Sequence, residues 1–334
     1  MSGFPLHPLS EVGFRFRPLL TEYGTEAGER FGWFVRSLMR PLVKGLAAGR
    51  FEGYVAQAGR RTAGIVAYAE YRGTARISLL HVGHEWRNRG VEERLLDATL
   101  ADLRDDPARL PPRRILSEAM MVSHSNQDAL WANRRFSVVP RLIMRTTLVR
   151  PATRTRMPLT RDAISRDGRP FRLRGWQAAD VRPITEVLRR ANGSSVDRDI
   201  YPELLDPEQA GAAVRGIAAG SCGRFDRRCT GVATTPDGTS IGVVLCSRCR
   251  PGEAFIVEVA VAPDWQGRGV GTALVARALD LLASRGVSDV SLGVTRANAA
   301  ALRLYERTGF WCAGEFGSYS WTSEVESSDI HRPA

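Results

Sequence analysis

The sequence predicts an α/β (α+β) protein made of two tandem copies of one fold, and three observations support this. The chain has 334 residues, 43% hydrophobic and 25% charged, which is enough apolar material for two mid-sized cores. Segments around Trp86 and Trp265 resemble each other. Short β-branched runs alternate with amphipathic helical patterns in both halves.

The internal repeat fixes the domain plan. Residues 81–92, HVGHEWRNRGVE, and residues 260–271, AVAPDWQGRGVG, share Trp, Arg, Gly and Val at the same spacing. A second pair of segments, 131–136 and 305–310, follows at nearly the same separation. We therefore expect a first domain at 1–150, a linker rich in Pro, Thr and Arg at 151–170, and a second domain at 171–334.

The expected elements follow the same order in each copy. In the first copy they are strands at 52–58, 63–70 and 75–82, a helix at 91–104, a strand at 114–119 and a helix at 126–134. In the second copy they are a strand at 171–174, helices at 181–190 and 207–219, a hairpin of strands 229–235 and 241–246 around Pro-Asp-Gly, a strand at 255–261, a long helix that a glycine-rich turn opens and that runs to about 284, a strand at 290–294 and a helix at 298–307.

The net charge of +11 does not by itself indicate a polyanionic partner. Of the 47 basic residues only Lys44 is a lysine, which is typical of arginine-rich codon usage. Residues 1–160 hold 25 basic and 15 acidic side chains and so carry nearly all of the excess. We expect no nucleic-acid partner, and keep an acidic acceptor or carrier surface as an alternative source of the charge. Without an apolar signal core or a long apolar run, we expect a cytoplasmic protein with no membrane partner.

The five cysteines predict reduced thiols, because an odd number without a signal peptide argues against a disulfide framework. Cys246 and Cys249 have CxxC spacing and could form a zinc site with Cys222 and Cys229. The six-residue step between the latter two does not suit such a site, so we expect no metal.

The glycine-rich turn between the strand at 255–261 and the long helix that follows predicts an anion site. Glycines 267, 269 and 271 let a ligand approach the backbone closely, and the free amides of a helix start favour negative charge. Arg268 adds a cation at the rim. A tight turn without a ligand is the alternative, since a Gly-x-Gly pair alone is weak evidence.

The second copy, over residues 171–322, closely resembles the Gcn5-related N-acetyltransferase (GNAT) family. The resemblance is carried by QGRGVG at 266–271 and NAAALRLYERTGF at 298–310, in this order. It implies in each copy a mixed, mostly antiparallel central sheet flanked by helices. It also implies acetyl-CoA, or another short acyl-CoA, as co-substrate between splayed strands. The residues implied to bind it are Val259, Ala260, Val261, Gln266, Gly267, Arg268, Gly269, Val270, Gly271, Thr272, Asn298 and Tyr305.

The resemblance makes Tyr305 the acid that protonates the departing thiolate, which a neutral phenol can do. The alternative for Tyr305 is an aromatic core residue. For the base we consider Glu258, which the strand pattern places on one face with Ile256 and Ala260, and Glu253 before the strand. A carboxylate in an apolar strand should have a raised pKa. A bound water is the third candidate for this role.

The first copy lacks these features, and we expect it to be a degenerate, non-catalytic domain that supports the acceptor site. Glu92 stands where the second copy has Gly271, and Glu93 follows it. Carboxylates there repel a pyrophosphate. Trp131 stands at the position of Tyr305 and cannot protonate a thiolate as a phenol does.

We therefore predict a GNAT acyltransferase that moves an acetyl or short acyl group from coenzyme A to a small-molecule amine by direct attack. The tandem arrangement resembles mycothiol synthases, so acetylation of a cysteinyl pseudo-disaccharide is one alternative. A non-catalytic acyl-CoA-binding regulatory module is another. A second copy of the chain, forming a homodimer, is kept as a candidate partner.

Overall fold

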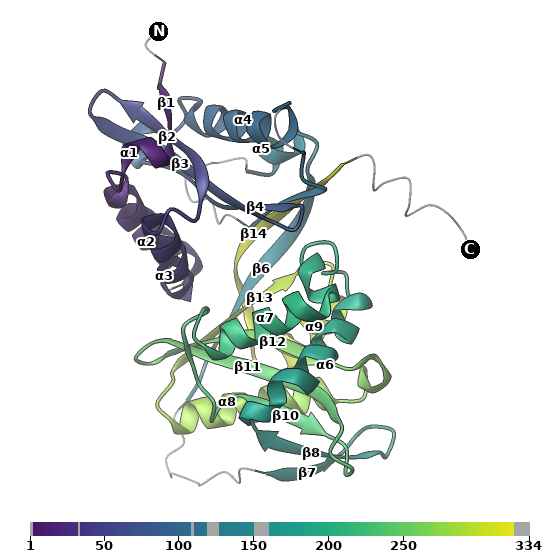
Figure 1. Ribbon diagram of the computed structural model, residues 1–334. Helices are drawn as coiled ribbons and strands as arrows, with labels where there is room; N and C mark the ends of the chain where they lie inside the picture. The colour runs from purple at the N-terminus through teal and green to yellow at the C-terminus, as the bar shows by residue number, and fades with distance from the viewer. Residues whose placement is uncertain (1–2, 33, 108–109, 119–126, 150–159, 324–334) are drawn as a thin grey trace. The chain divides into compact units, whose positions relative to one another are not determined.

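The protein divides into two compact units in a computed structural model that describes residues 3–32, 34–107, 110–118, 127–149 and 160–323 (Figure 1). The ranges that make up unit 1 are 1–30, 39–140 and 316–334, and those of unit 2 are 31–38 and 141–315.

These units differ from the predicted domains at 1–150 and 171–334, because two strands each begin in one unit and end in the other. Strand β6 (Ser137–Thr147) begins in unit 1 and continues into unit 2, and strand β14 (Trp311–Thr322) runs from unit 2 into unit 1. Of the predicted linker, 151–159 lies outside the described residues, and β7 (Arg161–Ile164) belongs to the sheet of unit 2.

Unit 1 has a mixed sheet in the order β1-β2-β3-β4-β5-β14, in which only β4 and β5 are parallel. The remaining strands are β1 (Leu6–Pro8), β2 (Glu52–Ala58), β3 (Arg61–Tyr71), β4 (Thr74–Val82) and β5 (Arg114–Ser117). The helices up to residue 132 are α1 (Leu9–Val12), α2 (Arg17–Phe31), α3 (Phe34–Ala47), the 3-10 turn η1 (His84–Trp86), α4 (Val91–Arg104) and α5 (Gln127–Ala132).

Helices cover both faces of this sheet, as alternating side chains of a strand require. Val66 and Leu80 pack in one core with residues of α4 and α5. On the other face, the ring of Tyr23 in α2 lies 5.2 Å from that of His81. Burial, with the charge of Arg87, lowers the pKa of His81 to about 3, so its imidazole is neutral near pH 7.

Unit 2 has a mixed, mostly antiparallel sheet in the order β6-β13-β12-β11-β10-β8-β7, with β9 added to β11. Its strands are β7, β8 (Pro170–Gly175), β9 (Arg224–Phe225), β10 (Gly231–Thr234), β11 (Ser240–Arg250), β12 (Glu253–Val261) and β13 (Asp289–Thr295). Its helices after residue 160 are η2 (Ala178–Asp180), α6 (Val181–Gly193), η3 (Pro202–Leu205), α7 (Pro207–Ala218), η4 (Pro263–Trp265), α8 (Val270–Ser284) and α9 (Ala299–Arg307).

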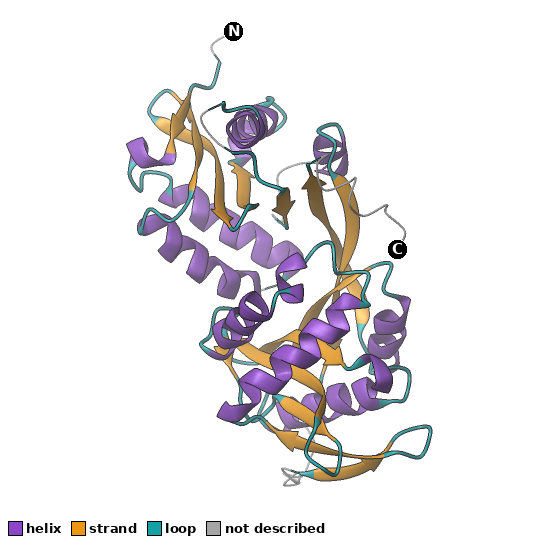
Figure 2. Cartoon of the chain, turned by 45° about the vertical axis from the view of Figure 1, so that its right-hand side comes forward, coloured by secondary structure: helices purple, strands orange, loops and turns teal. Residues whose placement is uncertain are grey.

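The two faces of the unit 2 sheet carry separate cores (Figure 2). Along β11, Val243 and Leu245 pack with residues of α6 and α7, whereas Val244 and Cys246 pack with residues of α8 and α9. The period of two places these side chains on opposite faces. Unit 2 therefore has three layers, with α6 and α7 on one face of the sheet and α8 and α9 on the other.

The predicted elements are confirmed within a few residues wherever the sequence analysis placed one in the described chain. The residues predicted at 119 and 126 lie outside the described ranges. Helices α1, α2 and α3 and strands β1, β6, β7, β9 and β14 had no predicted counterpart.

Candidate active site

The two central strands of unit 2 part halfway along their length. Parallel pairing of β12 with β13 covers Glu253–Phe255 and Asp289–Ser291 only. Beyond it, β12 continues to Val261 and β13 to Thr295. The strands expected to splay apart do so, and backbone groups of the second half of β12 face the opening.

The turn that follows β12 leads directly into α8. Gly267 and Gly269 have φ angles of 72° and 93°, in the region that favours glycine. Gly269 is the N-cap of α8 and carries no capping side chain, and the amide of Ala273 bonds to its carbonyl at 3.0 Å. The earlier amides of the helix start lack carbonyls one turn back and point out of the helix end.

The backbone has space for a ligand at Gly267 but not at Gly271. A Cβ atom built on Gly267 would have no heavy atom of the described residues within 4 Å, so the backbone there borders open space. At Gly271 the Cβ would lie 2.7 Å from Leu304 Cδ1 in α9. Gly267 thus fits an approaching anion, whereas Gly271 serves the packing of α8 against α9.

Two side chains of the turn are already engaged by the protein. Gln266 Nε2 donates to the carbonyl of Val261 at 3.0 Å and closes the turn. Arg268 donates through Nε to the carbonyl of Asp264 at 2.8 Å and pairs through Nη1 with the carboxylate of Asp167. The predicted rim cation is therefore partly neutralised by Asp167, from the β7–β8 connection.

Glu258 lies on the α6 face of β12, and the prediction that it shares a face with Ile256 is wrong. The register of β12 against β11 shifts between Ile256 and Glu258, which marks a β-bulge at Val257. Ile256 packs in the core of the α8 face, but Val257 and Ala260 pack in the core of the α6 face. From Glu258 on the strand is regular, so Glu258 and Ala260 point the same way.

The surroundings of Glu258 raise its pKa to about 7. Burial is the largest cause, and the negative charge of Asp197 adds to it, while the amide of Val259 and the charge of Arg141 oppose them. A carboxyl that titrates near neutral pH is suited to accept a proton. This result agrees with the raised pKa that the sequence predicted.

Asp197 and Arg141 were missed by the sequence analysis. Asp197 is held by hydroxyl donors, from Ser195 Oγ at 3.2 Å and from Thr295 Oγ1 at the end of β13. Arg141 comes from β6 and donates to Tyr201 Oη at 2.9 Å. Both lie far from Glu258 in sequence and sit in no recognisable motif, so only the fold brings their charges to it.

Tyr305 projects from α9 and is 7% exposed. Its ring meets that of Phe310 edge to face, with centroids 5.8 Å apart. Burial first, then the charges of Glu258 and Asp197, raise its pKa, so the phenol stays protonated. Among the described residues, none hydrogen-bonds to its hydroxyl, which leaves that proton free to be donated.

Asn298 is the N-cap of α9, and its Oδ1 accepts from the amide of Ala301 at 3.1 Å. Its local effect is to fix the start of the helix that carries Tyr305. Val259 and Val261 pack against the α8-side core. Val270 and Thr272 lie in the first turn of α8.

Glu253 occupies the opposite end of β12. Its carboxylate pairs with Arg250 at 2.6 Å, and its backbone pairs with Asp289 before the strands part. Five residues of strand place it roughly 16 Å from Glu258. The structure therefore brings Glu258 and Tyr305, and not Glu253, to the opening.

The corresponding positions of unit 1 differ in the ways that the sequence indicated. Glu92 lies in the first turn of α4 and is 1% exposed. Trp131 is fully buried and stacks on Tyr319, with centroids 4.7 Å apart and planes at 10°. A carboxylate and an indole thus occupy the places of Gly271 and Tyr305.

The cysteines show no arrangement for zinc within the described residues, since Cys229 and Cys246 are buried and Cys249 does not join them in a ligand cluster. Burial raises the pKa of Cys229 to about 12, which keeps this thiol protonated. No helix in the described chain is long and apolar enough to cross a membrane.

Comparisons with known proteins agree with this geometry. Residues 198–310, all in unit 2, match the family described as "Acetyltransferase (GNAT) family". A mycothiol acetyltransferase of Clavibacter michiganensis subsp. michiganensis (strain NCPPB 382) is 49% identical over 59 residues, which are 18% of this chain and 19% of that protein. The chain thus matches about a fifth of the length of this relative.

Two solved structures share the fold over most of the chain. A GCN5-related N-acetyltransferase from Sphaerobacter thermophilus has a TM-score of 0.59 and 19% identity, over 82% of this chain and 80% of that chain. A tandem GNAT protein from the clavulanic acid biosynthesis pathway has a TM-score of 0.52 and 14% identity, over 81% and 82%. Residues 198–310 thus match the GNAT family, and the two solved structures show that the chain shares their fold.

Proposed function

We propose that unit 2 transfers an acetyl or other short acyl group from its coenzyme A ester to an amine of a small molecule. The observation that carries this proposal is that Glu258, titrating near pH 7, and the free hydroxyl of Tyr305 lie close enough to interact electrostatically where β12 and β13 part. One group can take a proton and the other can give one.

The start of α8 fits the phosphates of coenzyme A. Its outward amides and the helix dipole favour an anion, and Gly267 leaves the backbone open to it. Arg268 adds positive charge at the rim. The open edge of β12 between Ile256 and Val261 offers backbone donors and acceptors to the pantetheine arm, whose thioester supplies the activated acyl group.

The chemistry then needs three proton movements, all of which this chain can serve. Glu258 takes a proton from the acceptor's ammonium, which frees the nitrogen lone pair to attack the thioester carbonyl. The Tyr305 hydroxyl gives its proton to the sulfur as the carbon–sulfur bond breaks, and the phenolate takes up the proton that the attacking nitrogen loses when it becomes the amide. No covalent bond to the protein forms, because the amine attacks directly.

A mycothiol-type acceptor is the second candidate. It is favoured by the 49% identity to a mycothiol acetyltransferase, although that match covers a short part of either chain. A cysteinyl pseudo-disaccharide also presents a primary amine, so the same two residues would serve it.

Unit 1 is proposed to be non-catalytic. Glu92 would repel a pyrophosphate at the start of α4, and the indole of Trp131, stacked on Tyr319, cannot replace the phenol of Tyr305. Titration calorimetry should therefore find one equivalent of acetyl-CoA bound per chain. Two equivalents would contradict this assignment.

The test of the function is release of free thiol from acetyl-CoA with a panel of amines, including a cysteinyl pseudo-disaccharide. The wild-type chain should release thiol with at least one amine, and Tyr305→Phe should lower kcat by about 10² to 10⁴ while the KM for acetyl-CoA stays within about threefold. Acetyl-CoA binding without turnover on any amine would instead indicate a regulatory module.

A further inference from the structure

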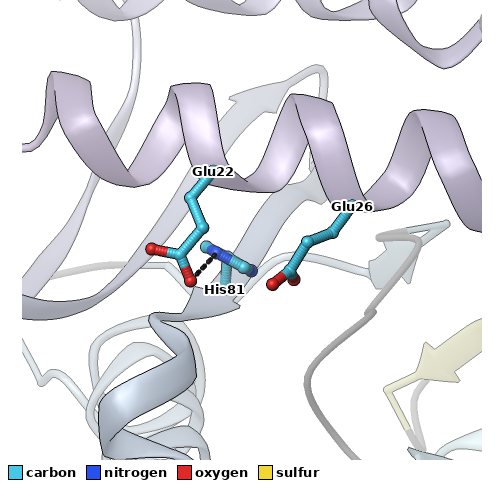
Figure 3. Close-up of side chains that lie close together, drawn as sticks. All are labelled: Glu22, Glu26 and His81. Carbon is cyan, nitrogen blue, oxygen red and sulfur yellow. Dashed lines mark ion pairs between the residues drawn. The ribbon is translucent and has the colours of Figure 1, made fainter.

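Unit 1 contains a cluster of three metal-ligating side chains outside the proposed acyltransferase site. Glu22 and Glu26 project from the same face of α2, one turn apart, toward His81 near the end of β4 (Figure 3). One ligand atom of each lies within 4.8 Å of the others.

His81 is the informative member of the cluster. It is fully buried, and among the described residues neither ring nitrogen has a hydrogen-bond partner. The closest approach to a carboxylate is 4.0 Å, from Nε2 to Glu22 Oε1, which is too long for a hydrogen bond. Leaving a buried polar group without a hydrogen bond costs free energy, so the unpaired imidazole beside two carboxylates indicates that a ligand satisfies it.

The carboxylates already attract positive charge. Arg87 Nη2 pairs with Glu26 and lies 3.8 Å from Glu22 Oε1. Glu22 Oε1 also accepts from the amide of His84 at 2.7 Å. The guanidinium shows where a cation is stabilised, and among the described residues neither it nor any other group bonds to His81 Nδ1 or Nε2.

The repeat adds an independent comparison. His81 stands where the second copy has Ala260, on the strand before the motif turn. Unit 1 therefore carries a ligating imidazole at a position where the proposed catalytic unit has a methyl group.

We propose that Glu22, Glu26 and His81 bind one divalent transition-metal ion in unit 1. Two carboxylates and a neutral imidazole suit first-row ions such as Zn²⁺, Co²⁺ or Mn²⁺, and the imidazole disfavours Mg²⁺ and Ca²⁺. The ion displaces the guanidinium of Arg87, and water fills the remaining coordination positions.

The test is titration of the full-length, chelator-treated chain with Co²⁺, followed by its visible absorption. One equivalent should bind without the intense near-ultraviolet band of a cobalt–thiolate bond. His81→Ala and Glu26→Gln should each weaken binding at least about tenfold, the loss seen even for groups that only orient a ligand. Glu29→Gln, at an exposed position of the same helix, should have no effect.

Thermal melting of the metal-free variants checks that each is folded. The side chain of Glu26 is 27% exposed, so Glu26→Gln should stay folded even if the buried substitution His81→Ala does not. Absence of Co²⁺ uptake, a thiolate band, or binding unchanged in Glu26→Gln would overturn the proposal.

Arg87→Gln separates a metal site from a permanent ion pair. Removing the guanidinium removes both a competitor and a positive charge, so Co²⁺ should bind at least about tenfold more tightly, a change of about 1.4 kcal/mol. Affinity that stays the same or falls would overturn the displacement and with it the proposed ion position.

Discussion

Gly271 in the first turn of α8 packs directly against Leu304 in α9, so that a Cβ atom on the glycine would lie 2.7 Å from Leu304 Cδ1. The neighbour of Leu304 is Tyr305. The start of one helix, where we place the phosphates, and the proposed acid on the other are thus mechanically linked.

We predict that Gly271→Ala lowers turnover because the new methyl group displaces the side chain of Leu304, next to Tyr305. Both kcat and the affinity for acetyl-CoA should fall, by about tenfold. Adding Leu304→Ala makes room for the new methyl group and should restore most of the loss, which a double-mutant cycle of kcat/KM measures. Equal losses in the single and double variants would show that the contact does not transmit the effect.

A second prediction concerns the pH dependence of the acyl transfer. If Glu258 is the base, kcat/KM should rise with pH through a limb near pH 7. Asp197→Asn removes a negative charge that raises the pKa of Glu258, so the limb should move to lower pH. The control is Asp199→Asn, an exposed carboxylate in the same segment, which should leave the profile unchanged.

Glu258 should also cost stability above neutral pH. Its pKa of about 7 in the folded chain exceeds its ordinary value of 4.5, so the folded state binds more protons than the unfolded state between those values. The free energy of unfolding therefore falls as pH rises through this window. Glu258→Gln should raise Tm at pH 8 relative to wild type and abolish transfer. A Tm of Glu258→Gln below that of the wild type at pH 8 would contradict this prediction, because it would show that the ionised carboxylate stabilises the fold.

A fourth prediction tests the rim cation. Asp167 neutralises Arg268, so Asp167→Asn should lower the KM for acetyl-CoA by a few fold and leave kcat unchanged. Arg268→Gln should raise that KM, with an effect that diminishes as salt is added. Asp162→Asn in β7, which releases an exposed pair with Arg172 in β8, serves as the matched control. A KM insensitive to both Asp167→Asn and Arg268→Gln would remove Arg268 from the phosphate site.

The exchanged strand predicts how the chain can be divided. A fragment 160–334 lacks β6, whose residues Arg141–Thr147 pair with Asp289–Thr295 of β13. Its β13 would have an open edge, and we expect it to aggregate. Joining residues 137–148 to the fragment through a Gly/Ser linker should give a soluble, cooperatively melting protein. Solubility of the fragment alone would show that β6 is dispensable.

The sequence located the parts of unit 2 whose signals are local. Glycines 267 and 269 at the end of a β-branched strand predicted the turn and the start of α8, and both adopt the expected positive φ. The bulge at Val257 was not predictable, because it depends on the register of β12 against β11. It reversed the face assigned to Ile256 relative to Glu258.

Long-range pairings were beyond a local pattern for the same reason. The segment 141–147, RLIMRTT, gives no sign that its partner is β13, about 150 residues later along the chain. Likewise, His81 reads as one more residue of an apolar strand until α2 brings Glu22 and Glu26 to it. The predicted absence of a metal rested on the cysteines, which are not the residues that the fold gathers.

The crossing of β6 and β14 between the two units also determines the order in which the units can complete folding during translation. Strand β14 closes on β5 of unit 1 through Tyr319 and Ser117, and Ser318 bonds to Glu118 across 200 residues of sequence. At translation rates of about 5–20 residues per second, β5 waits on the order of ten seconds or more for that partner. Unit 1, although made first, is the unit completed last, and its exposed edge is where we expect chaperones to engage the nascent chain.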